Sequence, residues 1–114
     1  MSVEDLLNKQ FHTVGNTPCW VFCQRVLSEM NLPVPMSLDK MERIDSPRIG
    51  TVVLFRQSKG GFHCGVVYPT TVHFVHCRVP LAQPTHPPVG RKDRLSDPLY
   101  KDIIDGYYGY RGQP

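Results

Sequence analysis

The residues whose types and spacing best suit catalysis are one cysteine and two histidines. Thr17 is suited to cap a helix and Pro18 to occupy its first position, so Cys19 is predicted to lie in the first helical turn. Unpaired amides and the helix dipole stabilise a thiolate there, so we expect the pKa of Cys19 to be lowered. His63 and His76 lie in two later apolar segments. A cysteine combined with histidines from elsewhere in the chain is what thiol–imidazole catalysis requires.

The helix that carries the cysteine is predicted over residues 18–31. Apolar residues recur at every third or fourth position from Cys23 onward, which is typical of a helix with one buried face. A shorter helix is predicted before it, over residues 2–10, because Ser2 and Asp5 have the spacing of a capping box. Two N-terminal helices are therefore expected to supply one layer of the fold.

The histidines are predicted to lie on strands. Residues 50–56, 62–68 and 72–79 are rich in β-branched and aromatic side chains and are joined by short turns, which predicts an antiparallel meander. Successive side chains of a strand point to opposite faces of the sheet. His63 and Cys64 are therefore expected on opposite faces, and so are His76 and Cys77. The sequence thus predicts an α+β fold with helices packed on an antiparallel sheet.

The rest of the chain is predicted to complete one domain over residues 1–114. A short helical turn is expected from Ser37 to Met41. Residues 80–97 are rich in proline and polar side chains and are expected to form a loop over the surface. Residues 99–111 return to apolar and aromatic types, which predicts a helical turn followed by a last strand.

Composition excludes several classes of function. The 114 residues include 40% hydrophobic and 20% charged side chains, as in ordinary globular proteins, and the formal charge of +3 favours approach to anionic polymers. The basic residues are scattered, and no phosphate-binding loop or RNA-binding signature is present, so neither a nucleic-acid partner nor a cofactor is expected. No segment has the length or apolarity of a membrane span. The chain also begins without a signal peptide, so we expect cytoplasmic synthesis and reduced cysteines.

Four segments of the chain together resemble the NlpC/P60 cysteine peptidases. That family combines Asp-Cys-Ser-Gly at a helix start with strands of the type Gly-Asp-Leu-Val-Phe-Phe, His-Val-Gly-Ile-Tyr and Phe-Ile-His-Ala. Here the corresponding stretches are Pro-Cys-Trp-Val, Gly-Thr-Val-Val-Leu-Phe, His-Cys-Gly-Val-Val-Tyr and Phe-Val-His-Cys, in the same order. The Gly-Tyr-Tyr-Gly-Tyr-Arg ending and the tryptophan after the cysteine are similar to members from bacteriophage tails. The resemblance covers nearly the whole chain.

The resemblance implies a papain-like fold and cleavage of amide bonds in peptidoglycan stem peptides. It implies Cys19 as nucleophile, His63 as general base and His76 as the residue that orients the base. The same roles follow from the chemistry, because the base must take the thiol proton and must itself be held in one orientation. The phage-like features imply a protein of the virion tail, with other tail-tip proteins as partners and the host cell wall or periplasm as its place of action.

The rim of the expected site departs from the family pattern. Pro18 replaces the usual acid, and Trp20-Val21 replaces Ser-Gly, so the rim is bulkier. Phe11 stands where the family has a tyrosine, and His12 follows it. Trp20, Phe11 and His12 are therefore the candidates for contact with substrate.

Two alternatives stay open beside the peptidase hypothesis. The first is a zinc site, since cysteines and histidines are zinc ligands, although the Cys-x-x-Cys spacing is absent and Cys23, Cys64 and Cys77 are better explained as small core residues. The second is a tail or baseplate protein that kept the peptidase fold with reduced activity. Thiol chemistry separates the hypotheses, because an active enzyme is expected to have a Cys19 that is alkylated faster than the other cysteines at mildly acidic pH.

Overall fold

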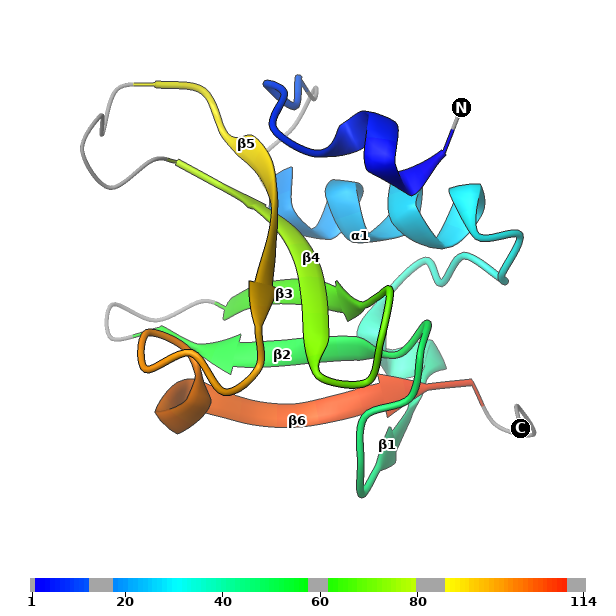
Figure 1. The fold of residues 1–114 in the computed structure, drawn as a ribbon. Helices are drawn as coiled ribbons and strands as arrows, with labels where there is room; N and C mark the ends of the chain where they lie inside the picture. The colour runs from blue at the N-terminus through cyan, green and yellow to red at the C-terminus, as the bar shows by residue number, and fades with distance from the viewer. Residues whose placement is uncertain (1, 13–17, 58–61, 80–85, 111–114) are drawn as a thin grey trace.

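The structure is a computed structural model that describes residues 2–12, 18–57, 62–79 and 86–110. Within these residues the fold is α+β, with one α-helix packed on a six-stranded antiparallel sheet (Figure 1). The strand order is β1-β6-β2-β3-β4-β5. The helices are η1 (Val3–Leu6), α1 (Pro18–Glu29), η2 (Leu38–Lys40) and η3 (Lys101–Ile103), where η denotes a 3₁₀-helix. The strands are β1 (Glu42–Ile44), β2 (Val52–Arg56), β3 (Phe62–Val67), β4 (His73–Arg78), β5 (Val89–Arg94) and β6 (Ile104–Gly109).

Helix α1 has the predicted start and a slightly earlier end. Pro18 is its first residue, where the missing amide hydrogen costs nothing. The predicted cap, Thr17, lies outside the described residues. The helix ends at Glu29, and Asn31 takes a left-handed conformation with φ of 58°, as is common just beyond a helix end.

The prediction for residues 2–10 was only partly right. The capping box between Ser2 and Asp5 is confirmed, with the Ser2 amide donating to the Asp5 carboxylate at 2.8 Å. The helix that it opens is a single 3₁₀ turn, η1, and not a helix of nine residues. The reason is that the chain leaves the helix at once to pair with β5, where the Asn8 amide donates to the Gly90 carbonyl at 2.7 Å.

The predicted meander is confirmed. Strands β2, β3 and β4 are consecutive antiparallel neighbours, with Leu54 opposite Cys64 and Val66 opposite Val75. The turn after Ser37 and the final turn and strand are also present, as η2, η3 and β6. In Figure 1, β4 and β5 stand nearly upright while β2, β3 and β6 run across the view, which shows how strongly the sheet twists.

The prediction of a loop throughout residues 80–97 was wrong. Residues Val89–Arg94 form strand β5, which pairs along the whole of β4. Its sequence is mostly polar because β5 is the last strand of the sheet and several of its side chains are exposed. Strand β1 at the other edge was not predicted either, and it too is short and mostly exposed. Edge strands of this kind lack the apolar alternation by which strands are recognised.

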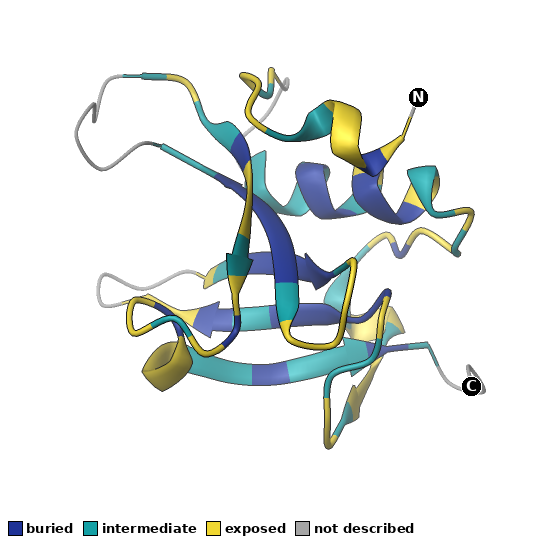
Figure 2. Ribbon diagram, viewed as in Figure 1, coloured by how far each residue is buried: buried dark blue, intermediate teal, exposed yellow. Residues whose placement is uncertain are grey.

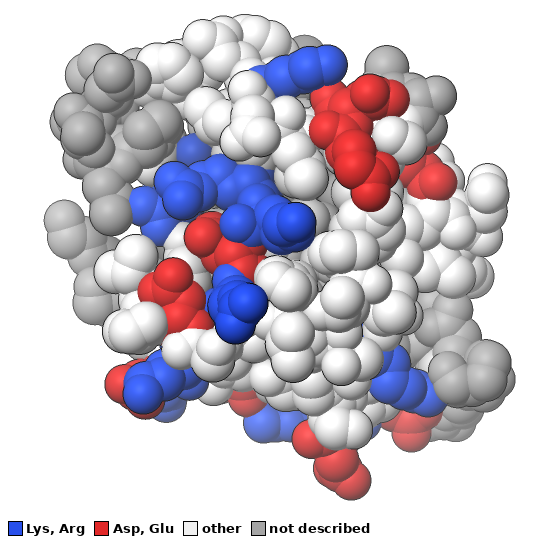
Figure 3. All heavy atoms as spheres, in the orientation of Figure 1, with Lys and Arg blue, Asp and Glu red and all other residues white. Residues whose placement is uncertain are grey.

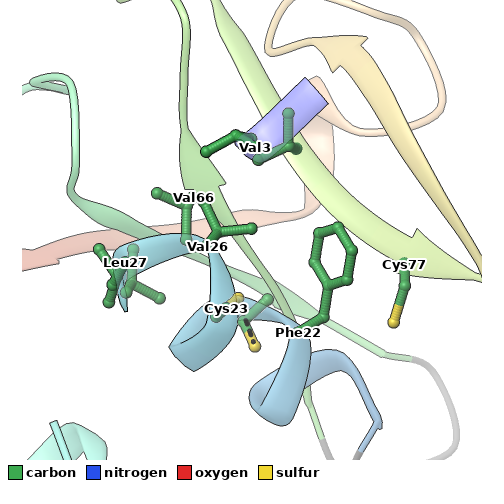
Figure 4. Close-up of a cluster of buried hydrophobic side chains, with 10 residues drawn as sticks. Val3, Phe22, Cys23, Val26, Leu27, Val66 and Cys77 are labelled. Atoms are coloured by element: carbon green, nitrogen blue, oxygen red, sulfur yellow. Dashed lines mark hydrogen bonds between the residues drawn. The ribbon is translucent and has the colours of Figure 1, made fainter. Parts of the chain in front are cut away.

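The main core lies between α1 and one face of the sheet. Phe22, Cys23, Val26 and Leu27 project from α1 and are at most 1% exposed, and they meet Val66 among other strand residues (Figure 4). Figure 2 shows this buried side of α1 facing buried stretches of the strands. Cys23, Cys64 and Cys77 all belong to this core, as predicted. The packing fixes the start of α1 against the sheet.

A second, smaller core covers the opposite face of the sheet. It consists of buried side chains from β2, β3 and β4 together with two residues from the segment that links β5 to η3. Its aromatic members pack closely, with the ring centroids of Phe55 and Phe74 5.0 Å apart and those of Phe74 and Tyr100 5.1 Å apart. His63 and His76 adjoin this aromatic cluster. No helix of the described residues is long and apolar enough to span a membrane.

Candidate active site

The start of α1, the start of β3 and the end of β4 meet around one pocket. It has a volume of about 300 Å³, and Cys19, His63 and Arg78 are among the side chains that line it. Cys19 is half-buried, and its Sγ lies 4.0 Å from the carbonyl oxygen of Phe62. The remaining residues that line the pocket are Pro18, Gln57, Phe62, Cys77, Val79 and Pro88. The structure thus places the predicted nucleophile and the predicted base at one surface.

His63 and His76 are in direct contact. Nε2 of His63 lies 2.7 Å from Nδ1 of His76, a hydrogen-bonding distance, and the two rings meet edge to face at 76°. The contact joins β3 to β4. The three residues predicted from the sequence therefore form a continuous series from the pocket inward.

His76 is completely buried, with no exposed side-chain surface. The rings of Phe74 and Tyr100 both pack against it, with centroids 4.5 and 5.3 Å from its own. This burial lowers the pKa of His76, although the neighbouring carboxylate of Asp93 acts in the opposite direction. The packing holds the ring in one position and favours its neutral form.

Asp93 is a further member of the series that the sequence analysis did not identify. Its Oδ2 lies 2.7 Å from Nε2 of His76, and the side chain is only 13% exposed. The hydrogen bond from His76 lowers the pKa of Asp93, and Arg91, whose Nε lies 3.5 Å from the same oxygen, acts in the same direction. Asp93 lies on β5, and because this strand was not predicted, the position of Asp93 beside His76 was not predicted either. An acid within an otherwise basic run was the only signal in the sequence.

The charge on Asp93 sets the direction of the hydrogen bonds. An ionised carboxylate only accepts, so Nε2 of His76 must carry the hydrogen. In a neutral imidazole the other nitrogen then accepts, and Nδ1 of His76 receives a hydrogen from Nε2 of His63. Neutral His63 is left with a free lone pair on Nδ1. That is the state in which it can take a proton from a thiol.

The expectation of a lowered pKa for Cys19 was wrong. The neighbouring Cys64 thiol and burial raise the pKa of Cys19, and the interaction with His63 lowers it by less than they raise it. The helix start alone suggested a stable thiolate, but the sequence did not reveal that the Cys64 thiol would lie beside it. The resting state is therefore a neutral thiol next to a base, and fast alkylation of Cys19 at mildly acidic pH is no longer expected.

The three residues predicted at the rim lie in different places. Trp20 lines an adjacent apolar pocket with Met36 and Phe62, and Phe62 also lines the Cys19 pocket. Phe11 packs edge to face against Phe22, with centroids 5.0 Å apart, and does not line the Cys19 pocket. His12 is exposed and does not line it either. Of the three, only Trp20 lines a pocket that shares a residue, Phe62, with the Cys19 pocket.

The four cysteines are free thiols, and two of them, Cys19 and Cys77, line the pocket. Cys23 and Cys64 are in contact, with their sulfur atoms 3.4 Å apart, inside the main core. No group of three or more histidine, cysteine or acidic side chains among the described residues is arranged to hold a metal ion.

No protein-family profile matches the chain, and no curated protein matches it significantly. Function is therefore inferred from the residues of the site.

Proposed function

We propose that this protein is a cysteine peptidase of the NlpC/P60 type that cleaves amide bonds in peptidoglycan stem peptides. The observation that carries the proposal is the series Cys19, His63, His76 and Asp93, in which two consecutive hydrogen bonds of 2.7 Å leave one nitrogen of the base unprotonated and the base lines the same pocket as the thiol. A nucleophile at the start of a helix and a base on the neighbouring antiparallel sheet are also what a papain-like fold requires.

In the acylation step, Nδ1 of His63 takes the thiol proton while Sγ of Cys19 attacks the carbonyl carbon of the amide. Because the resting thiol is neutral, His63 must remove its proton before or during the attack. The carbon–nitrogen bond then breaks, and His63 returns the proton to the leaving amine. A thioester on Cys19 and a free amine are the products of this step.

In the second step, water is the nucleophile. His63 removes one of its protons as the oxygen attacks the thioester, and the thiolate that leaves recovers that proton. The products are the carboxylic acid and the free thiol of Cys19. His76 and Asp93 hold His63 in position and stabilise the positive charge that it carries in each transition state.

The start of α1 supplies donors for the oxyanion. The first amide groups of an α-helix have no partner within the helix, and Pro18 has no amide hydrogen. The amides of Cys19 and Trp20 are consequently the first donors available to the carbonyl oxygen of a substrate bound at Sγ.

Digestion of purified stem peptides, analysed by mass spectrometry, tests the proposal. Wild-type protein should release one defined fragment, and Cys19→Ala should release none. Cys23→Ala is the matched control, because it removes a thiol one helical turn away that lies in the core, outside the pocket. If none of the three proteins cleaves while all are folded, the peptidase proposal is refuted.

The phage-like ending and the tryptophan after the nucleophile support a place in a virion tail tip, where the enzyme would open the host wall or act during tail assembly. A folded but inactive protein incorporated in particles would instead be a structural tail component that retained the peptidase fold. Incorporation and cleavage are measured separately, so the two hypotheses are distinguishable.

A further inference from the structure

A second pocket lies at the opposite end of the β4–β5 pair from the Cys19 pocket. It has a volume of about 480 Å³, and none of its lining residues also lines the Cys19 pocket. The start of β4, the end of β5 and the turn that follows β5 form this pocket. The polar residues that line this β5 pocket are His73, Lys92, Asp93, Arg94, Ser96 and Asp97.

Strand pairing brings the basic side chains of the β5 pocket together. Arg94 lies directly opposite His73 in the pairing of β4 with β5, and Lys92 is two positions before Arg94. Residues that are opposite each other, or two apart on one strand, share a face of the sheet. The three side chains therefore leave the sheet on the same side. Figure 3 shows lysine and arginine atoms gathered over β5, with acidic atoms among them.

The two carboxylates that line the β5 pocket are already engaged. Oδ2 of Asp93 accepts a hydrogen bond from Nε2 of His76 at 2.7 Å and lies 3.5 Å from Nε of Arg91. Oδ1 of Asp97 accepts a hydrogen bond from the amide of Leu99 at 2.9 Å. Asp93 thus orients His76, and Asp97 stabilises the turn after β5.

The two cations of the β5 pocket are left without an acid partner. Among the residues that the structure describes, no carboxylate lies within ion-pairing distance of Lys92 or Arg94. Arg91 offsets the charge of Asp93. The two cations therefore face only one further carboxylate, that of Asp97. The pocket has an excess of positive charge, which attracts an anion.

Two further donors lie beside the cations. His73 is half-buried, and its Nδ1 lies 2.7 Å from Oγ1 of Thr70, whose oxygen also accepts a hydrogen bond from the amide of Val72 at 3.2 Å. These bonds hold the imidazole ring in one orientation, so its other nitrogen, Nε2, is the one available to a ligand. Ser96 adds a hydroxyl from the turn after β5. The pocket thus combines ammonium, guanidinium, imidazole and hydroxyl groups.

We propose that the β5 pocket binds a phosphate group. A phosphate group presents charged oxygen atoms in several directions, so donors from two strands and a turn can each bind one of them. A carboxylate has two oxygens in one plane and would leave some of these donors unused. The volume of about 480 Å³ also leaves room for the rest of a molecule that carries the phosphate. Because the two pockets share no lining residue, this site does not depend on the proposed function of the Cys19 pocket.

A titration of the whole chain, followed by the NMR shifts of the backbone amides, tests the proposal. The probes are sodium phosphate and poly(glycerol phosphate), each at an ionic strength held constant with sodium chloride. Phosphate should shift the amides of residues 92–97 in a saturable manner. Sodium acetate under the same conditions should shift them much less, because a carboxylate engages fewer of the donors.

Substitutions of the two cations measure their contributions. Lys92→Met and Arg94→Met should each weaken phosphate binding about 3- to 10-fold, since both cations are exposed, and the double variant about 10- to 100-fold. Lys40→Met is the matched control, because it removes one exposed positive charge of η2 that does not line the β5 pocket. This control should bind phosphate as wild type does. If the double variant does not fold, the two single variants still decide the outcome.

The two probes distinguish the sources of the phosphate. Saturable binding of poly(glycerol phosphate) at a lower concentration of phosphate groups than inorganic phosphate would support a site for a phosphodiester polymer. Binding of inorganic phosphate alone would support a site for a free phosphate or a small monoester. Shifts that chloride or acetate reproduce, or an equal loss with Lys40→Met and Arg94→Met, would overturn the proposal. Cleavage of stem peptides by the Lys92→Met and Arg94→Met proteins should be unchanged, so either proposal can fail without the other.

Discussion

Replacing Asp93 by asparagine or alanine perturbs the series Cys19, His63, His76 and Asp93 at the end farthest from the thiol. Oδ2 of Asp93 is close to two donors, Nε2 of His76 at 2.7 Å and Nε of Arg91 at 3.5 Å. An asparagine would turn its carbonyl oxygen toward both donors. The direction of the hydrogen bonds along the series would then be unchanged, and only the negative charge would be lost.

The expected magnitude follows from that geometry. A hydrogen bond to a charged group contributes about 1.5–3 kcal/mol and a neutral one about 0.5–1.5 kcal/mol, so Asp93→Asn should lower kcat about 5- to 15-fold. Asp93→Ala removes the acceptor entirely and frees His76 to reverse its hydrogen, so its kcat should fall by about 10- to 150-fold or more. The alanine variant also leaves a fully buried donor on His76 unpaired, which costs about 1–3 kcal/mol of stability.

Steady-state cleavage of a stem peptide measures these effects, with Asp102→Asn as a matched control at an exposed acid of η3. KM should be unchanged in both Asp93 variants, because Asp93 does not line the Cys19 pocket. The rate of Cys19 alkylation should fall in the same order, which provides a test that needs no substrate. A folded Asp93→Ala protein with wild-type kcat would refute the proposed role of Asp93.

Further predictions concern pH and packing. Burial lowers the native pKa of His76 below its usual 6.5, so the unfolded state binds more protons under mildly acidic conditions. The free energy of unfolding, measured with urea, should therefore decline as the pH falls below about 6.5. A profile that is flat from about pH 7.5 to 5 would contradict this. Gly65→Ala places a Cβ 2.8 Å from the Phe74 ring and should reduce both melting temperature and kcat, since β4 must move; unchanged kcat would argue against close packing there. Gly90→Ala places a Cβ 2.1 Å from the Leu6 carbonyl oxygen and should release the N-terminal segment, seen as faster amide exchange around Asn8; exchange at the wild-type rate would refute that pairing.

The central part of the fold was predictable because its signals are local. The β-branched and aromatic side chains of β2, β3 and β4, with the short turns between them, identified the meander, and the proline before Cys19 identified the helix start. The sequence also assigned Cys64 to the core. These are short-range patterns of the kind that a single sequence carries.

The position of Asp93 beside His76 and the raised pKa of the Cys19 thiol were not predictable in this way. Asp93 lies on a polar edge strand that follows a proline-rich stretch, so nothing local marked it as a partner of His76. The pKa of Cys19 is raised by Cys64, 45 positions later in the chain, and that contact exists only once α1 has packed on β3. Properties that arise from tertiary contacts leave little trace in the order of residues.

The central claim is that Cys19 is the nucleophile of an acyl-transfer reaction. Trapping the thioester tests it most directly: wild-type protein is mixed with stem peptide, quenched in acid within milliseconds and analysed by peptide mass spectrometry. Wild-type protein should give an acyl adduct on the peptide that contains Cys19, absent from Cys19→Ala and formed far more slowly in His63→Ala. Fragment release without any adduct on Cys19, or an adduct on another cysteine, would contradict it.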